Sequence, residues 1–370
     1  MKLILNFIII LLNLIFAVMK LLPVQNKVVF ISRQDDCKSD DMKLLEKAIS
    51  QCQNKPVKQV FLCKKFDGGV CKKALYCFHA LRQMYHLATS KVVVLDSYCI
   101  AVSVLRQRHS TVIIQMWHAL GALKKFGFSI IDEEEGRSSK IADIMKMHRN
   151  YSYILASSEP CVPFFADAFD YKEESIKIMS LPRVDKLTDK ALKKSTIEQI
   201  YERYPEFHEK KLVVYAPTFR KGKDISKEID DLASQFDKDK YVFILKRHPL
   251  MKKEEVMCLE DRDFPTIDML IAADYVICDY SAVVFEAAIL KKPLFFYDFD
   301  YDRYSSGRDF YINYLEEMPG VIFSDAKQIA SAVKEDNYDL KKVEAFSRKY
   351  VEEQDECSRK LADFILSFIN

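Results

Sequence analysis

The feature that most constrains this fold is an alternation of short apolar runs with helix-length amphipathic segments, repeated in both halves of the chain. The apolar runs are rich in β-branched residues and therefore predict strands. In the first half the predicted strands cover residues 27–32, 57–62, 91–96, 111–116, 151–156 and 176–179. In the second half they cover residues 211–216, 241–246, 275–278, 293–297 and 321–323. Strands that alternate with helices build a parallel sheet covered on both faces, so we predict an α/β protein with two doubly wound domains facing a cleft.

The boundary between the halves is a charged, weakly apolar stretch at 186–211, from which we predict a linker and a helix at 196–203. At 370 residues the chain is too long for one ordinary core. We therefore expect one domain at residues 25–190 and a second at residues 195–370. The other predicted helices cover residues 40–53, 72–89, 225–236, 281–290, 325–335, 340–353 and 357–369.

The N-terminal segment is a candidate membrane element. Residues 3–19 are apolar except for Asn6 and Asn13, and their length is close to the minimum that spans a bilayer core. Asn6, Asn13 and Lys20 are spaced by seven residues and form one polar stripe on a helix. Four interpretations remain open: a cleaved signal peptide, a spanning anchor, a helix in the membrane plane with its stripe outward, and a helix packed on the body. We favour an uncleaved membrane-associating helix over residues 1–22.

Flanking charges and cysteines indicate the side of the membrane. Lys20, Lys27 and Arg33 follow the apolar segment, in agreement with the positive-inside bias. The ten cysteines contain no CxxC pair, which is typical of reduced thiols in the cytosol and argues against a cysteine metal site. We therefore expect the body to lie at the cytoplasmic face of the cell membrane.

Composition excludes two classes of function. Lys plus Arg is 56 and Asp plus Glu is 54, so the chain lacks the basic excess of a nucleic-acid coat and we expect no nucleic-acid partner. Glycine occurs only 8 times, and neither a Walker loop nor a dinucleotide-binding loop is present. We expect no cofactor, and phosphate recognition by side chains and a helix end.

Polar side chains stand where predicted strands end, which is where doubly wound sheets bind ligands. Trp117 and His118 follow the strand at 111–116, and we expect a helix to begin just after them. A neutral histidine there accepts a proton from an attacking hydroxyl, although a lone histidine also suits a hydrogen-bonded packing role. Lys124 and Lys125 come next and suit phosphate binding.

Basic and hydroxyl groups follow two further strands. Arg183 suits a forked contact with phosphate or an ion pair with Asp185. Thr218 and Arg220 present a hydroxyl and a guanidinium, which suit phosphate oxygens or form a solvated turn.

The next two strand ends carry the same kinds of group. Lys246, Arg247 and His248 supply two cations and a histidine that serves either a diphosphate or proton transfer. Asp279 precedes Ser281, which we predict to cap the helix at residues 281–290 and to aim its positive end at the ligand.

An acidic loop carries Asp298 and Asp300, with Arg308 downstream. Alternate aspartates resemble a metal pair, but they commonly form a solvated loop, so we predict no metal. Together, the clusters at the strand ends predict a cleft for a phosphate-rich substrate.

The motifs WHA-x-GA-x-KK-x-G, LPR-x-D, APTFR, K-x-HP, CDYS-x-x-x-F-E and KKP-x-x-x-Y-x-x-D occur in this order over most of the chain. This set resembles the CDP-glycerol:glycerophosphotransferase family, the TagB/TagF-like enzymes of teichoic acid synthesis. The resemblance implies a GT-B-like pair of Rossmann-like domains at the inner membrane face. It also implies a CDP-glycerol or CDP-ribitol donor, a polyprenyl-diphosphate-linked acceptor, and release of CMP.

The resemblance also implies roles for matched residues. His118 stands at the family's general-base position and His248 at its second functional histidine. The implied substrate-binding residues are Lys124, Lys125, Arg183, Asp185, Thr218, Arg220, Lys246, Arg247, Asp279, Ser281, Glu286, Asp298 and Arg308. The chain departs from the family pattern at Ala119, Ala282, Glu286 and Asp309. Because both histidines are intact, these departures bear on donor identity more than on activity.

The implied reaction transfers glycerol phosphate from CDP-glycerol to an acceptor hydroxyl. His118 would take the hydroxyl proton, while Arg220, His248 and the helix at Ser281 would neutralise charge on the diphosphate and departing CMP. Transfer of ribitol phosphate, a GT-B nucleotide-sugar transferase and a non-catalytic membrane scaffold are the alternatives. The sequence leaves open whether one unit is added or many, and whether the product is teichoic acid or capsule.

Overall fold

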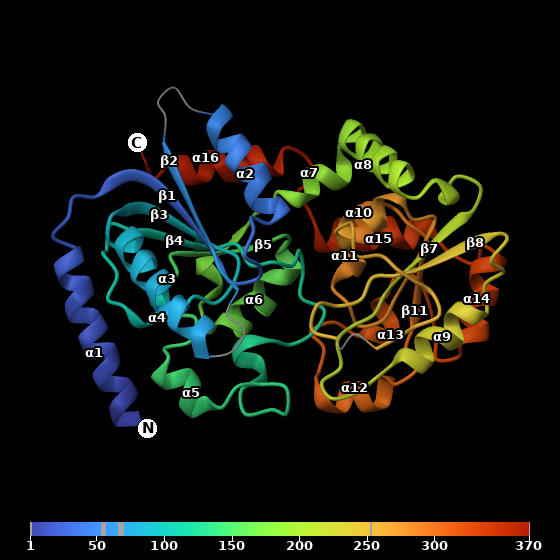
Figure 1. The fold of residues 1–370 in the computed structure, drawn as a ribbon, viewed down its shortest axis with the longest axis horizontal. Helices are drawn as coiled ribbons and strands as arrows, with labels where there is room; N and C mark the ends of the chain where they lie inside the picture. The colour runs from blue at the N-terminus through green and yellow to red at the C-terminus, as the bar shows by residue number, and fades with distance from the viewer. Residues whose placement is uncertain (1, 53–56, 66–69, 252–253, 370) are drawn as a thin grey trace. The chain divides into compact units, whose positions relative to one another are not determined.

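The computed structural model describes residues 2–52, 57–65, 70–251 and 254–369, without the side chains of residues 70–75. Its contacts divide the chain into two compact units (Figure 1). Unit 1 comprises Met1–Ala119, Phe126–Arg183 and Glu356–Asn370, and unit 2 comprises Leu120–Lys125 and Val184–Asp355.

Unit 1 is built on a six-stranded, fully parallel sheet with the order β2-β1-β3-β4-β5-β6. Its strands are β1 (Gln25–Ser32), β2 (Lys58–Cys63), β3 (Ser90–Leu95), β4 (Val112–Gln115), β5 (Tyr153–Ala156) and β6 (Ile176–Ile178). Its helices are α1 (Lys2–Met19), α2 (Asp40–Gln51), α3 (Val70–Ala88), α4 (Ile100–Val104), α5 (Ser139–Ile144), α6 (Val162–Phe169) and α16 (Cys357–Leu366). The central strands are buried on both faces, which explains their continuous Val and Ile runs.

Unit 2 is built on a second six-stranded parallel sheet, with the order β12-β11-β10-β7-β8-β9. Its strands are β7 (Lys211–Ala216), β8 (Tyr241–Leu245), β9 (Leu259–Glu260), β10 (Tyr275–Cys278), β11 (Leu294–Tyr297) and β12 (Val321–Phe323). The helices of this half are α7 (Arg183–Thr188), α8 (Lys190–Arg203), α9 (Ser226–Ser234), α10 (Thr266–Ala272), α11 (Val283–Ile289), α12 (Tyr301–Gly307), α13 (Tyr314–Glu317), α14 (Ala326–Lys334) and α15 (Leu340–Tyr350).

Each sheet has one point where the strand order reverses, and there the connections leave in opposite directions. In unit 1 this switch point lies between β1 and β3, and in unit 2 between β7 and β10. Loops that follow the two strands diverge at such a point and leave a crevice for ligands. The chemistry of each unit is therefore expected at these strand ends.

The α/β fold with two parallel sheets is confirmed, and all eleven predicted strands are present within one or two residues. The short edge strand β9 was not predicted. The charged stretch after residue 186 is more helical than predicted, because α7 and α8 occupy most of its first half.

Two segments lie outside the domain bounds expected from the sequence. α16 belongs to unit 1, where it packs beside α2 (Figure 1), although residues 195–370 were expected to form one domain. Leu120–Lys125 belongs to unit 2, where Lys124 forms a β-bridge with Phe310. Both placements depend on contacts between segments far apart in sequence.

Helix α1 lies along the outside of unit 1 beside α3 (Figure 1). It is long and apolar enough to cross a membrane, with a mean hydropathy of 2.5, and only 6% of it is buried. Length and composition do not distinguish a membrane span from a signal sequence. Asn13 and Lys20 of the polar stripe both bond to the body of unit 1, so this edge of α1 faces the protein and its apolar side faces outward.

Candidate active site

His118 follows β4 by three residues and lies at the switch point of unit 1. The turn that carries it is strained, because Trp117 has a φ of 63°, a left-handed conformation that a bulky residue rarely adopts. The Trp117 N–H donates to the buried Gln115 side chain at 3.0 Å, and the Trp117 ring stacks on Phe126. These contacts hold the turn in place. The expected helix directly after His118 is absent; the next helical residues form the 3₁₀ turn Gly127–Ile130.

The imidazole of His118 is held as a neutral base. Its Nδ1 lies 3.0 Å from the backbone oxygen of Asp96, at the end of β3. Because a carbonyl oxygen only accepts, this contact places the proton on Nδ1 and leaves a lone pair on Nε2. Burial lowers the pKa of His118 to about 4, so the ring is neutral at pH 7. Among the described residues Nε2 has no hydrogen-bond partner, so it is available to take a proton.

Two neighbours of His118 were not predicted as site residues. Gln34, which follows β1, places its side-chain amide 3.2 Å from Nδ1 of His118; because the Nδ1 proton points to the Asp96 oxygen, this amide is a close neighbour of the ring and not a donor to it. Asp96 is buried, its Oδ1 has no hydrogen-bond partner among the described residues, and burial raises its pKa to about 6. Both stand at the ends of the two strands that flank the reversal of strand order, and that position was the signal that could have identified them.

Arg183 forms an ion pair within unit 1. Its backbone N–H and its Nε donate to the two carboxylate oxygens of Asp41 at 2.7 and 2.8 Å. Asp41 lies in the first turn of α2 and is 2% exposed, so this ion pair is buried. Arg183 therefore has a buried carboxylate partner in Asp41, while Asp185 lies in the first turn of α7.

The switch point of unit 2 brings Thr218, Arg220 and Asp279 together, as their strand-end positions predicted. The Thr218 N–H donates to both carboxylate oxygens of Asp279 at 2.9 and 3.0 Å. Arg220 donates from Nη1 to Asp279 and from Nε and Nη2 to the two oxygens of Asp300, each at 2.8 to 2.9 Å. The Thr218 hydroxyl is buried and has no hydrogen-bond partner among the described residues.

The charged side chains around Arg220 compensate one another. Burial alone disfavours a charged guanidinium, but the carboxylates of Asp279 and Asp300 offset this and raise the pKa of Arg220. In return, although burial opposes it, Arg220 lowers the pKa of Asp300. Because all three nitrogens of Arg220 bond to protein, its direct role here is to fix Thr218 and Asp279. Asp300 is a partner of Arg220, while Asp298 is a separate buried carboxyl whose pKa is raised by burial.

The three basic residues after β8 divide into two groups. Lys246 donates to the Asp261 carboxylate at 2.6 Å and to two backbone oxygens, and Arg247 pairs with Glu260 at 3.2 Å. Both cations therefore bind the segment at β9. His248 instead stacks on Phe219 and remains at the strand end.

His248 has the opposite tautomer to His118. Its Nδ1 accepts the Leu250 N–H at 3.2 Å, which places the proton on Nε2. Burial and then the charge of Lys124 lower the pKa of His248, so the neutral form is favoured. Among the described residues the Nε2–H group has no acceptor, so His248 offers a donor where His118 offers a lone pair.

The remaining predicted residues of unit 2 lie around the Leu120–Lys125 segment and α11. Lys124 donates to the Tyr304 hydroxyl at 3.0 Å, and Lys125 pairs with Asp309 at 2.6 Å. Arg308 donates to the Lys125 backbone oxygen at 3.0 Å. These contacts join the KK motif to the loop after α12.

The predicted helix cap at Ser281 is wrong. α11 begins at Val283 with Ala282 at the cap position, and the Ser281 hydroxyl accepts the Val283 N–H only at a long 3.4 Å. With seven residues, α11 is too short for its dipole alone to form an anion-binding site. Glu286 is buried on this helix. Among the described residues no group of three or more His, Cys, Asp or Glu side chains is placed to hold a metal.

Known proteins resemble this chain over most of its length. The sequence pattern of the CDP-Glycerol:Poly(glycerophosphate) glycerophosphotransferase family matches residues 14–367. The chain is 36% identical over 364 residues to the teichoic acid ribitol-phosphate primase of Bacillus spizizenii, covering 94% of this chain and 93% of that protein. It is 30% identical over 303 residues to the teichoic acid glycerol-phosphate primase of Bacillus subtilis, covering 79% of this chain and 77% of that protein.

The fold is also that of a solved structure. The wall teichoic acid polymerase TagF matches with a TM-score of 0.77 at 20% identity, covering 100% of this chain and 97% of that one. At this identity the likeness shows the fold alone: two parallel α/β sheets in one chain. The resemblance seen in the motifs is thus confirmed by sequence and by fold.

Proposed function

We propose that this chain, which belongs to the CDP-glycerol:poly(glycerophosphate) glycerophosphotransferase family, transfers a polyol phosphate from a CDP-activated donor to a hydroxyl of a lipid-linked precursor, releasing CMP. It is an enzyme of teichoic acid biosynthesis, a phosphotransferase like its relatives. The observation that carries the proposed chemistry is the pair of opposite tautomers at His118 and His248.

In the proposed reaction the acceptor hydroxyl attacks the phosphorus that bears the polyol. The new P–O bond forms as the bond to the CMP oxygen breaks, and CMP leaves with the electron pair. His118 Nε2 takes the hydroxyl proton, which contributes roughly 10²–10⁴ to the rate. On this proposal unit 1 supplies the base, while unit 2 binds the donor.

Donor recognition in unit 2 is proposed to use a neutral group rather than the buried cations. The His248 Nε2–H, which has no acceptor among the described residues, is free to donate to a phosphate oxygen, whereas Arg220 and Lys246 are engaged with carboxylates. Lys124 and Lys125 add positive charge near the Tyr304 side of the cluster. Preorganised donors of this kind stabilise charge that develops on the leaving group.

Two donors are candidates. The family pattern favours CDP-glycerol, which the motifs also predicted. CDP-ribitol is the second candidate, because the relative matched over 94% of this chain is a ribitol-phosphate primase. The proposed site of action is the cytoplasmic face of the cell membrane, supported by the exposed apolar helix α1.

CMP release by the purified chain tests the proposal. The chain is offered CDP-glycerol, CDP-ribitol or UDP-N-acetylglucosamine, each with and without a lipid-linked glycerol-phosphate acceptor. We expect acceptor-dependent CMP from one CDP-polyol, lost in His118→Ala and kept in the control His109→Ala, an exposed histidine. No CMP from either CDP-polyol, with UMP or UDP from the sugar nucleotide, would contradict the proposal.

A further inference from the structure

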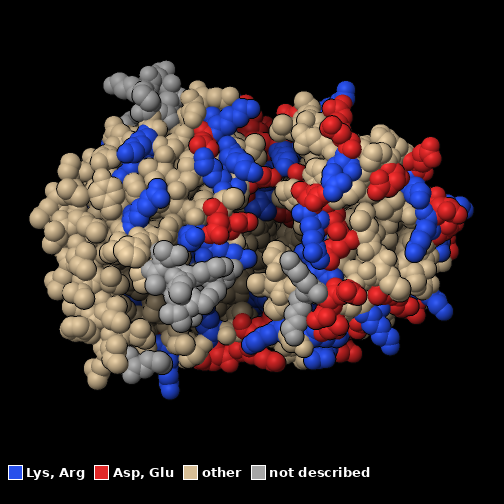
Figure 2. All heavy atoms as spheres, viewed as in Figure 1, with Lys and Arg blue, Asp and Glu red and all other residues tan. Residues whose placement is uncertain are grey.

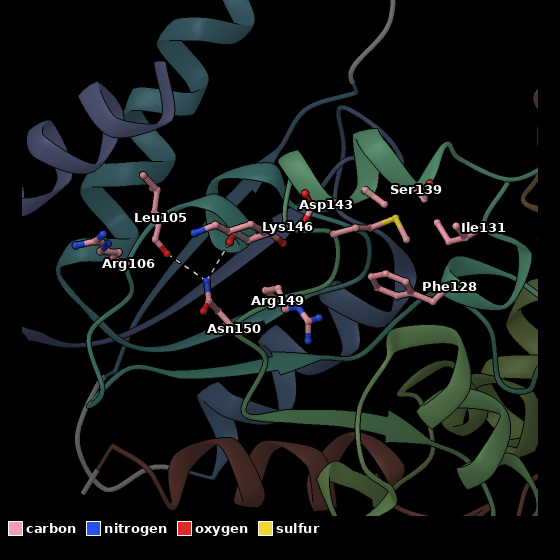
Figure 3. Close-up of a pocket in the computed structure, with 12 residues that line it drawn as sticks. Leu105, Arg106, Phe128, Ile131, Ser139, Asp143, Lys146, Arg149 and Asn150 are labelled. Carbon is pink, nitrogen blue, oxygen red and sulfur yellow. Dashed lines mark hydrogen bonds between the residues drawn. The ribbon is translucent and has the colours of Figure 1, made fainter. Parts of the chain in front are cut away.

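A basic groove lies beside α1 in unit 1 and is lined by none of the candidate active-site residues. Two cavities of about 690 and 680 Å³ share Arg106, Asp143 and Lys146 in their walls. The first is lined by α5 and by the apolar side chains of Phe128 and Ile131 (Figure 3). The second is lined by α1. Because they share a wall, they form one groove that runs from an apolar pocket to an exposed apolar helix.

The cations of this groove differ from those at the switch point of unit 2. The side chains of Arg106 and Lys146 are exposed and have no ion-pair or hydrogen-bond partner among the described residues. Lys20 adds a third cation and donates to the Arg106 backbone oxygen at 2.9 Å. The one acid of the shared wall, Asp143, lies 3.9 Å from Lys2 and is exposed. Among the described residues that line it, the groove therefore carries a net positive charge.

The backbone that carries Lys146 is held in a strained form. Lys146, His148 and Asn150 have φ values of 45°, 56° and 72°, in the left-handed region that Asn and His enter more readily than Lys does. The Asn150 amide donates to the backbone oxygens of Val102, Ser103 and Leu105 at 2.8 to 3.2 Å, as Figure 3 shows in part. His148 is buried against Phe169. Strain of this kind persists only where surrounding contacts fix it, and it accumulates at functional sites.

Asn13, on the polar edge of α1, hydrogen-bonds to the segment that carries Arg106. Asn13 donates to the Val104 backbone oxygen at 3.1 Å and accepts the Arg106 N–H at 2.8 Å. This orientation leaves the apolar face of α1 in solvent: Leu3 is 85% exposed, Phe7 68% and Leu14 61%. In Figure 2 the left edge, where Figure 1 places α1, is a continuous surface without Lys, Arg, Asp or Glu. A helix bound by its polar edge with its apolar face outward is suited to lie in a membrane surface.

We propose that this groove binds the phosphate headgroup of an anionic membrane lipid. Arg106 and Lys146 contact the phosphate, and the apolar face of α1 enters the acyl region next to it. The occupant is assigned by charge complementarity with the unpaired cations and by continuity with the exposed apolar helix. The inference rests on the proposed function in one respect, that the acceptor lies in a membrane, and it adds the part of unit 1 that meets that membrane.

The first test measures co-sedimentation of the full chain with vesicles of phosphatidylglycerol or of phosphatidylcholine. We expect the double variant Arg106→Gln with Lys146→Gln to lose affinity for phosphatidylglycerol by about twenty-five-fold, since each cation near a membrane contributes about five-fold. Its binding to phosphatidylcholine should not change. The matched control Lys47→Gln with Lys172→Gln removes two exposed cations of unit 1 that do not line the groove. An equal loss in the control, or equal wild-type binding to both vesicles, would overturn the inference.

A second variant tests the apolar half of the site. Phe7→Glu with Leu14→Glu should weaken binding to both kinds of vesicle, while thermal unfolding is unchanged because both side chains are exposed. Inorganic phosphate should not release the protein from phosphatidylglycerol beyond sodium chloride of equal ionic strength. Release by phosphate would show a site for any free anion and contradict a lipid site.

CMP release separates this inference from the proposed function. The double variant is expected to keep wild-type turnover with a short-chain, soluble acceptor and to lose it with an acceptor embedded in vesicles. An equal loss with the soluble acceptor would assign the groove to the acceptor itself and overturn a bilayer site. If the wild type binds phosphatidylglycerol selectively but releases no CMP from any donor, the proposed function fails while the lipid site stands.

Discussion

The two switch points differ in whether their polar groups are already satisfied. In unit 1 the crevice between β1 and β3 holds an uncharged imidazole and the carboxyl of Asp96; among the described residues neither His118 Nε2 nor Asp96 Oδ1 has a hydrogen-bond partner. In unit 2 the crevice between β7 and β10 holds a full charge network in which Arg220 bridges Asp279 and Asp300. The crevice of unit 1 therefore has polar atoms available for a reaction, whereas the charged groups in the crevice of unit 2 are largely engaged in ion pairs with one another.

The difference shows that cations near strand ends are a poor measure of phosphate-binding capacity. A buried charge loses its hydration and needs a partner, so Arg220, Lys246 and Arg183 each have a carboxylate. Cations without such partners are exposed, as Arg106 and Lys146 are in the groove beside α1. Each of the following predictions tests this contrast between open and closed groups.

The largest effect is expected from His118→Ala. Loss of the base should lower kcat by roughly 10²–10⁴, with little change in the free energy of unfolding, because only one hydrogen bond is lost. Steady-state CMP release and urea unfolding measure the two quantities, with His109→Ala as the control. A variant that keeps more than half of its activity would show that the open nitrogen is not the base.

The opposite pattern is expected from Asp279→Asn. Removing one carboxylate leaves Arg220 buried with less than its full charge compensation, which should cost about 3–5 kcal/mol in the free energy of unfolding. The control Glu344→Gln removes the exposed pair with Lys291 and should cost less than about 1 kcal/mol. Equal values for the two variants, from urea unfolding, would show that the unit 2 network is not closed.

The pH dependence should report the low pKa of His118. The ring stays neutral down to about pH 4, so the acid limb of kcat/KM that belongs to His118 should lie near pH 4. Between the unfolded value of about 6.5 and the folded value, the unfolded chain binds more protons, so His118 lowers stability as pH falls through this window. The loss of unfolding free energy from pH 7 to 5 should be smaller in His118→Gln. An acid limb near 6.5 that vanishes in this variant would contradict the buried neutral ring.

The smallest effect is expected at Ser281. Its hydroxyl does not cap α11 at a normal distance, so Ser281→Ala should change the free energy of unfolding by less than about 0.5 kcal/mol. Asp325 caps α14 through the N–H groups of Lys327 and Gln328, and Asp325→Ala should cost about 1 kcal/mol. Equal losses would restore Ser281 as a true cap.

Local patterns predicted much of the fold because strands and helices are specified by neighbouring residues. Runs such as Lys211–Ala216 and Tyr275–Cys278 were located to the residue. The strand-end rule also placed Thr218, Arg220 and Asp279 in one crevice. It did not identify Gln34 or Asp96, because neither has a distinctive motif and each matters only through its distance to His118.

The sequence by itself determined the alternation of elements, the positions of the strands and the family, since these depend on periodicity and on motifs read along the chain. Only the tertiary structure decided which polar groups are engaged in ion pairs or hydrogen bonds and which remain available to a ligand. Arg183 pairs with Asp41, 142 residues away, and Arg220 with Asp300, 80 residues away. The tautomers of His118 and His248 likewise depend on backbone groups that folding brings to Nδ1. Charge pairing and protonation depend on distance and burial, which a linear sequence does not contain.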